Sequence, residues 1–117
     1  MPLDAKAYLA DMTAAANQIA VFTSGKTYAD YLSNDLLRSA VERQFEIVGE
    51  ALRKLSELDP DMVMKIPEYR RIIAFRNVLV HGYASVDHWL VWGIIENKLP
   101  ALRAAVASLA GGAADAA

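Results

Sequence analysis

The 117-residue sequence contains no cysteine. This absence excludes disulfide bonds, thiolate nucleophiles and cysteine-ligated metal sites, and it fits a reducing compartment. The sequence also lacks a charge-free apolar run of about 18 residues, so it predicts no transmembrane helix and no membrane partner. Because no basic segment followed by an apolar run stands at the start, we expect no signal peptide and a cytoplasmic protein.

Basic residues are scarce for a protein that binds nucleic acid along a broad surface. The chain has 12 Lys and Arg against 14 Asp and Glu, which gives a formal net charge of -2. Any contact with nucleic acid should therefore be local, transient or assembled from two chains. Hydrophobic residues make up 55% of the chain, which is high for so small a domain, so we expect self-association into a homodimer.

Motifs of several common enzyme classes are missing. There is no GxxxxGK[ST] phosphate loop, no GxGxxG after a strand and no HExxH zinc motif. The two histidines, His81 and His88, are separated by a predicted helix break, which is poor spacing for a metal site. We therefore expect neither a metal nor another cofactor.

The apolar residues that are present recur at spacings of three and four, which is typical of helices. The connections between these segments are short, so the predicted fold class is all-α, an up-and-down bundle of four main helices. The main helices are expected at residues 4–23, 33–58, 67–81 and 85–110, with a short helical turn at 27–32. One helical domain would cover residues 1–110, and a flexible Gly/Ala-rich tail would cover residues 111–117.

Capping and breaking residues set these predicted bounds. Gly25 and Gly82 are expected to end the first and third main helices. Pro67 suits the first turn of the third helix. Ser85 is the candidate cap of the last helix, which Pro100 is expected to kink.

One glycine stands in the middle of the second main helix. Gly49 costs about 1 kcal/mol there relative to alanine, so we expect that it lets another helix approach closely. The next residue, Glu50, is predicted to form an ion pair with Lys54 one turn later.

Two groups of residues have both a functional and a structural interpretation. Asp59 and Asp61 could act as an acid pair, but turn chemistry is favoured because they flank a proline. Four aromatic residues could stack nucleic-acid bases, but aromatics at helical spacing more often pack in a core or a dimer interface. These four are Tyr28, Tyr31, Trp89 and Trp92.

Arg76, Asn77 and His81 form the strongest candidate site. At about 100° per residue, Asn77 and His81 lie on one helix face, and Arg76 is adjacent to that face, about 140° from His81. We therefore expect the polar groups to converge loosely near the C-terminal end of the helix. An imidazole can move a proton at neutral pH, and a guanidinium can hold a phosphate and stabilise the charge that develops on it. These residue types suit phosphodiester cleavage, which requires no metal.

The candidate site has basic neighbours and a structural alternative. Arg70 and Arg71 lie just upstream and could contact RNA phosphates. One chain offers a single motif histidine, whereas acid and base roles usually need two groups, so a symmetric dimer would complete the site. In the structural alternative, Arg76 is a surface residue, His81 caps a helix end and Tyr83 lies at the edge of the core.

The run Arg76-Asn77-x-x-x-His81-x-Tyr83 resembles the R-x4-H-x-Y signature of the HEPN superfamily, and more closely its HepT branch. Residues 38–51 resemble the long central helix of that branch, and residues 76–100 are similar to its C-terminal half. The likeness covers most of residues 3–108.

The resemblance implies a HEPN-like helical bundle that dimerises around a shared cleft and cleaves RNA without a metal, as the toxin of a toxin–antitoxin pair. Arg76 and His81 would be catalytic, and Asn77 would assist them. The partner would be a minimal nucleotidyltransferase antitoxin, which can add AMP to Tyr83 and silence the toxin. The alternative function is a non-catalytic, nucleotide-binding helical partner of that enzyme, in which Tyr83 is the acceptor and Arg76 binds the incoming triphosphate.

Overall fold

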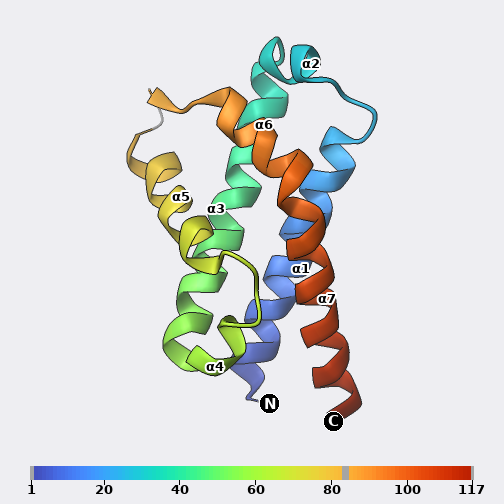
Figure 1. Ribbon diagram of the computed structural model, residues 1–117, viewed down its shortest axis with the longest axis vertical. Coiled ribbons are helices and arrows are strands. Elements are labelled where there is room, and N and C mark those ends of the chain that lie inside the picture. The colour runs from blue at the N-terminus through green and yellow to red at the C-terminus, as the bar shows by residue number, and fades with distance from the viewer. Residues whose placement is uncertain (1, 83–84, 117) are drawn as a thin grey trace.

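The computed structural model describes residues 2–82 and 85–116, and this part of the chain is all-α (Figure 1). The helices described there are α1 (Leu3–Thr23), α2 (Tyr28–Leu32), α3 (Asp35–Leu58), α4 (Pro60–Val63), α5 (Tyr69–His81), α6 (His88–Asn97) and α7 (Leu99–Ala116). The predicted fold class, an all-α bundle, is confirmed. None of the helices in this part of the chain is long and apolar enough to cross a membrane.

α1 and α3 form the central pair of the bundle. α5 packs on α3, and α7 packs on α1, so each central helix has two long neighbours. The apolar residues that recur at spacings of three and four along these two helices face each other in the core. Their fully buried side chains include Leu9, Met12, Ile19, Val41, Phe45, Val48, Leu52 and Leu55.

α7 closes the bundle against the first helix. Leu102 and Val106 of α7 are buried in the same core as the α1 stripe. Beside this apolar contact, Nε of Arg103 donates a hydrogen bond to Oδ1 of Asn17 at 3.1 Å. Because these two residues are 86 positions apart, the bond joins the beginning and the end of the fold.

Several helix ends follow the sequence prediction. Gly25 ends the turn after α1 with a φ of 71°, the left-handed region that glycine adopts at little cost. Asn34 caps α3, because its Oδ1 accepts a hydrogen bond from the backbone N–H of Leu37 at 3.0 Å. Asp59 caps α4 in the same way through the N–H of Met62 at 3.1 Å, so the turn interpretation of Asp59 is confirmed.

The start of α5 differs from the prediction. The helix begins at Tyr69, and Pro67 lies in the turn before it instead of in its first turn. The cause is Glu68, whose φ of 57° places its backbone in the left-handed region. Its carboxylate lies 3.1 Å from Arg71 and 3.0 Å from Lys98, two ion pairs that accompany this conformation.

The expected kink at Pro100 is a complete break between two helices. α6 ends at Asn97, and Pro100 is the second residue of α7, where its missing N–H has no helical partner to lose.

At its C-terminal end, α7 continues through Gly111 and Gly112, where the sequence predicts that the helix stops. Each glycine costs about 1 kcal/mol relative to alanine, which is too little to end a helix among alanines.

The cap of α6 is Asp87 and not Ser85. Oδ1 of Asp87 accepts hydrogen bonds from the backbone N–H groups of Trp89 at 3.0 Å and Leu90 at 3.2 Å. Ser85 instead donates its hydroxyl to the carbonyl of Gly82 at 3.1 Å, in the turn that follows α5.

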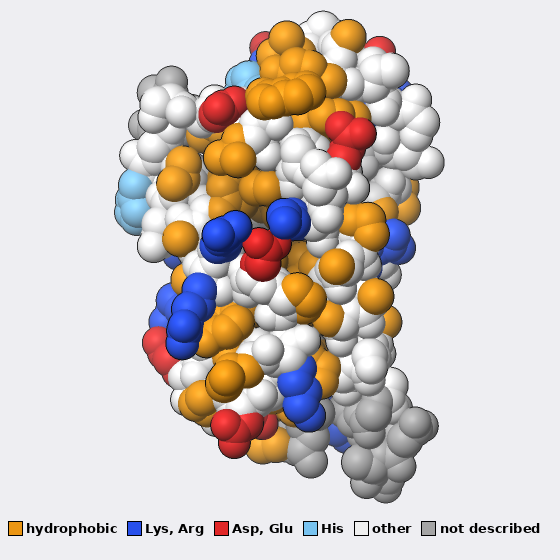
Figure 2. Space-filling view, in the orientation of Figure 1, with side chains coloured by type: hydrophobic (Ala, Val, Ile, Leu, Met, Phe, Trp, Pro, Cys, Tyr) orange, Lys and Arg blue, Asp and Glu red, His pale blue; other side chains and the backbone are white. Residues whose placement is uncertain are grey.

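An aromatic cluster joins α2 to α6. The ring of Tyr31 lies 5.3 Å from that of Trp92, and both side chains are buried, which confirms their interpretation as core residues. The ring of Tyr28 meets that of Trp89 edge-on at 4.8 Å, but Trp89 remains 63% exposed. Figure 2 shows hydrophobic side chains gathered on the surface at this end of the molecule.

Candidate functional site

α5 presents different residues on three of its sides. One side faces the core, and its buried residues recur at the spacing of three and four that is typical of a helix. They are Ile72, Phe75 and Leu79. A second side forms an exposed outer ridge, whose residues lie within about 40° of one another around the helix. The outer ridge carries Arg70, Asn77 and His81.

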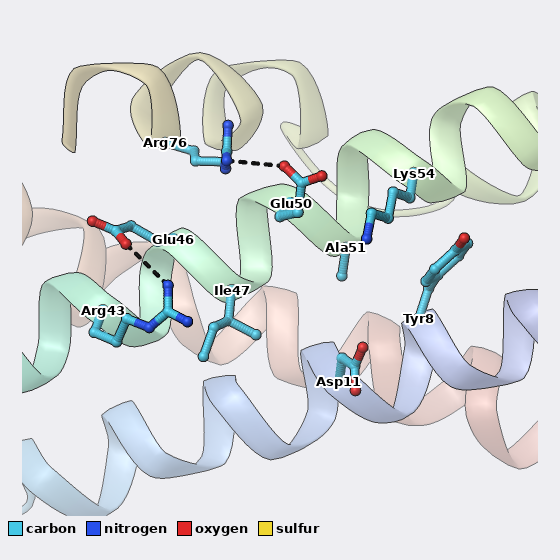
Figure 3. A pocket seen from close by; sticks show the side chains of 9 residues that line it. All are labelled: Tyr8, Asp11, Arg43, Glu46, Ile47, Glu50, Ala51, Lys54 and Arg76. Atoms are coloured by element: carbon cyan, nitrogen blue, oxygen red, sulfur yellow. Dashed lines mark hydrogen bonds and ion pairs between the residues drawn. The ribbon is translucent and has the colours of Figure 1, made fainter. Parts of the chain in front are cut away.

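The third side of α5 carries Arg76 and faces α3. The Arg76 side chain is only 25% exposed, and its Nη2 lies 3.0 Å from Oε2 of Glu50 (Figure 3). Its Nε is buried and has no hydrogen-bond partner among the described residues. A guanidinium has five N–H donors, so this ion pair occupies only part of its capacity.

Gly49 allows this contact between α3 and α5. A Cβ built on Gly49 would lie 2.5 Å from Cβ of Arg76, and 3.1 Å from both its Cγ and its Cδ. Any side chain on residue 49 would therefore push the two helices apart. The close approach predicted for Gly49 is confirmed, and the helix that approaches is the one that carries the motif.

Glu50 shares its carboxylate between two arginines. Its Oε1 accepts a hydrogen bond from Nη2 of Arg53 at 2.6 Å, while its Oε2 faces Arg76. The hydrogen bonds from Arg53 lower the pKa of Glu50, and the positive charge of Arg76 adds to that effect. The predicted pair with Lys54 is replaced by these contacts, and Lys54 instead lies 5.9 Å from the ring centroid of Tyr8.

A pocket of about 180 Å³ opens beside Arg76, between α1, α3 and α5 (Figure 3). Its charged lining is balanced, with three basic and three acidic side chains, which agrees with the absence of a net basic charge in the sequence. These side chains are Arg43, Lys54, Arg76, Asp11, Glu46 and Glu50. An anionic ligand could bind here through the donors of Arg76 that Glu50 leaves open and through Lys54, which has no ion pair among the described residues.

His81 is the last residue of α5 and is exposed. Asn77 lies one turn earlier on the same outer ridge, as the spacing predicted. Arg76 points towards α3, so the structure joins Asn77 and His81 and sets Arg76 apart from them. Tyr83, the predicted modification acceptor, lies outside the described residues.

The two upstream arginines differ in their surroundings. Arg71 is tied to Glu68 by an ion pair at 3.1 Å, so part of its charge is already matched. The guanidinium of Arg70 lies 5.4 Å from the ring centroid of its neighbour Tyr69 and has no acidic partner within ion-pair distance among the described residues. Of the two, Arg70 is the better placed for a phosphate.

A second polar cluster lies where α2, α3 and α6 meet. Tyr31 OH and Nδ1 of His88 are buried and have no hydrogen-bond partner among the described residues, and their rings are 6.4 Å apart. Burial raises the pKa of the nearby Glu42 carboxyl, although the charges of His88 and Arg38 oppose that shift. Across residues 2–82 and 85–116, no three His, Asp or Glu side chains are grouped closely enough to hold a metal ion.

Sequence reasoning missed the roles of Glu50 and Gly49 around Arg76. The isolated glycine in a long amphipathic helix did indicate a close helix contact, but it did not identify the partner. No periodic signal links residue 50 to residue 76, because the contact depends on how α3 and α5 cross.

An all-α bundle with an Arg-Asn-x-x-x-His motif on one helix is the architecture of a HEPN-type protein. The chain belongs to the ribonuclease HepT-like family, whose family model matches residues 12–109. The family named from the motif and its flanking helices is therefore confirmed.

Curated relatives carry names of the same kind. The chain is 32% identical over 100 residues to "Putative RNase MJ1380" of Methanocaldococcus jannaschii, covering 86% of this chain and 91% of that protein. It is 31% identical over 98 residues to "Probable ribonuclease HepT" of Thermococcus cleftensis, covering 84% and 88% of the two chains. No solved structure gives a significant match.

Proposed function

We propose that this protein is a toxin that cleaves RNA internally without a metal ion, in the cytoplasm and under the control of an antitoxin. One observation carries the proposal. In a chain of the ribonuclease HepT-like family, Asn77 and His81 stand exposed on the outer ridge at the end of α5, and Arg76, on the side of the same helix that faces α3, keeps donors that Glu50 does not occupy.

The proposed reaction uses the neighbouring 2′-hydroxyl of RNA as the nucleophile. A motif imidazole removes the hydroxyl proton, the 2′-oxygen attacks phosphorus, and the 5′-oxygen leaves with a proton from a second group. The products are a 2′,3′-cyclic phosphate and a 5′-hydroxyl. Arg76 would stabilise the charge on the non-bridging oxygens, and Asn77 would orient His81 or bind one oxygen.

A homodimer would complete this site. Because Arg76 and His81 lie about 140° apart around α5, one chain does not direct both towards one phosphate, whereas two facing α5 helices would supply two imidazoles. An apolar groove of about 340 Å³ between α5 and α6, with Val78 and Leu90 on its rim, offers surface for the contact (Figure 2). Sedimentation should give the mass of two chains at micromolar concentration, and a one-chain mass would contradict the dimer.

The activity is tested by expressing the wild type, His81→Ala and Arg76→Ala without the partner. We expect the wild type to arrest growth and fragment RNA, and both variants to be harmless. His88→Gln, which changes the other histidine, is the control and should remain toxic. Purified wild type should cleave RNA in the presence of a chelator, and equal RNA integrity in all four strains would refute the proposal.

We propose that the antitoxin is a minimal nucleotidyltransferase that adds AMP to Tyr83. A bulky anionic group placed two residues after His81 would block RNA sterically and by charge. Intact-mass spectrometry of protein made with the partner should show one or more added AMP units. Tyr83→Phe should remove the shift, and a shift that survives this change would place the modification elsewhere.

The alternative is a non-catalytic partner that binds the nucleotide for the nucleotidyltransferase. The charge-balanced pocket beside Arg76 favours it, because a neutral surface suits one small ligand better than a long RNA. Metal-independent cleavage by purified protein that is lost in Arg76→Ala would defeat this alternative.

A further inference from the structure

Two consecutive residues of α3 hold Arg76 at both ends. Gly49 lies against the aliphatic stem of the arginine, and Glu50 pairs with its guanidinium. We propose that Glu50, with Gly49 beside it, is a positioning residue that sets where the Arg76 guanidinium meets the RNA phosphate. The inference rests on the proposed function, which gives Arg76 that phosphate.

The aliphatic stem of Arg76 is held by the close contact between α3 and α5 at Gly49. With Cγ and Cδ of Arg76 both 3.1 Å from where a Cβ of residue 49 would stand, the stem runs directly across the α3 backbone. Since α3 and α5 share one core, through a Phe45–Phe75 edge-to-face contact at 5.4 Å, this crossing point does not move freely. The first bonds of the side chain are therefore fixed by packing.

The guanidinium of Arg76 is held by the carboxylate of Glu50, which is itself fixed by Arg53. Arg53 donates to Oε1 of Glu50 at 2.6 Å and also reaches Glu57 at 2.8 Å, so three residues on consecutive turns of α3 brace one another. Because those hydrogen bonds lower the pKa of Glu50, its carboxylate stays ionised at neutral pH and keeps its hold on Arg76. A surface ion pair without such bracing would leave a long arginine mobile.

The remaining donors are those a phosphate needs. Glu50 faces Nη2, while the buried Nε has no partner among the described residues. Nη1 has no partner among the described residues either and is not buried, so a guanidinium held at Nη2 can offer Nη1 to a phosphate without first losing the entropy of its own rotamers. Because the proposed role of Arg76 is to stabilise the charge that develops on the phosphate during cleavage, we expect Glu50 to act mainly on the catalytic step and not on RNA affinity.

The test compares Glu50→Gln with Glu46→Gln in RNA cleavage. Glu46 lines the same pocket one turn earlier and pairs with Arg43 at 3.2 Å, so it is a matched control that does not pair with Arg76. We expect Glu50→Gln to lower kcat roughly ten- to a hundredfold with little change in KM, as a misplaced catalytic group does. Glu46→Gln should retain wild-type kcat, and thermal unfolding of both variants should confirm that they are folded.

A second readout does not depend on cleavage. In the NMR spectrum of protein labelled with ¹⁵N-arginine, the Nε–H signal of Arg76 is assigned as the one that is missing in Arg76→Ala. This signal should shift in Glu50→Gln and keep its position in Glu46→Gln. If the wild type cleaves RNA and Glu50→Gln cleaves equally well, or if the signal does not move, the positioning role is overturned alone. If the wild type does not cleave RNA at all, the proposed function fails, and the positioning role in catalysis fails with it.

Discussion

The carboxylate of Glu68 lies 3.0 Å from Nζ of Lys98, and this contact ties the start of α5 to the junction of α6 and α7. The same carboxylate pairs with Arg71 at 3.1 Å. One residue with a left-handed backbone thus orients the helix that carries the motif against the C-terminal part of the bundle. The contact also closes one end of the apolar groove between α5 and α6.

Two substitutions at Glu68 distinguish the strain of its left-handed backbone from the stabilisation that its ion pairs provide. Glu68→Ala and Glu68→Gly lose the same two pairs, but only glycine adopts a positive φ without strain. We expect the glycine variant to be the more stable by about 1 kcal/mol in urea unfolding. Equal stabilities would contradict the left-handed conformation.

Adding one methyl group at Gly49 should destabilise the protein. Because the new Cβ would meet Cβ of Arg76 at 2.5 Å, we expect Gly49→Ala to cost about 1–3 kcal/mol in unfolding free energy. Gly93, inside α6, is the control, since nothing lies within 4 Å of its virtual Cβ. Gly93→Ala should be neutral or stabilise by up to about 1 kcal/mol, and a similar cost at both positions would refute the close contact.

Two glutamates of α3 should respond to pH with opposite sign. Burial raises the pKa of Glu42, so its proton favours the folded state, and ionisation opposes folding as pH rises through the carboxyl range. Hydrogen bonds from Arg53 lower the pKa of Glu50, so its contribution is present above the ordinary carboxyl pKa and is lost on acidification. At neutral pH we therefore expect Glu42→Gln to stabilise and Glu50→Gln to destabilise.

Both differences from the wild type should shrink as the pH falls below about 4, where the carboxyl groups become protonated. Thermal unfolding followed by circular dichroism at several pH values would measure them. Two substitutions with the same sign at neutral pH would contradict one of the two shifts.

The hydroxyl of Tyr31 should be dispensable for stability. Its side chain is fully buried, and the hydroxyl has no hydrogen-bond partner among the described residues. Removing an unsatisfied polar group should be neutral or favourable, so we expect Tyr31→Phe to stabilise by up to about 1 kcal/mol. Tyr31→Leu, which also removes the ring contact with Trp92, should cost about 2 kcal/mol or more.

A loss of more than about 1 kcal/mol in Tyr31→Phe would show that the hydroxyl makes a hydrogen bond, for instance through water. Denaturant unfolding of the two variants beside the wild type separates these outcomes.

Local signals in the sequence predicted the long helices well and the junctions less well. The limits of α3 follow from an amphipathic stripe and from Asn34, both of which act within a few residues. The start of α5 was missed because the left-handed conformation of Glu68 accompanies a contact with Lys98, 30 positions later. The sequence predicts a kink at Pro100 where the structure has a break, since a proline near a helix start and a proline inside a helix have the same local sequence pattern.

The candidate site was predictable to a similar degree. Helical geometry alone placed Asn77 and His81 on one face, but the loose convergence expected for Arg76 is not found, because its side chain is turned towards α3. The partner of Arg76 was not predictable, because Glu50 had a plausible nearby partner in Lys54, and only the crossing of α3 and α5 decides between them. Reasoning within one helix therefore finds the chemical groups, and the tertiary contacts decide how they are held.

The Asn17–Arg103 hydrogen bond and the apolar contact of α7 with α1 bear on synthesis of the chain. α1 is made before both of its long partners, and one of them, α7, is made only after α3, α5 and α6. Until Leu102 and Val106 have emerged, part of the apolar stripe of α1 is uncovered, even though the pairing with α3 can form early. The growing chain would thus expose an incomplete helix pair to chaperones until α7 has been made, and the complete bundle would form only then.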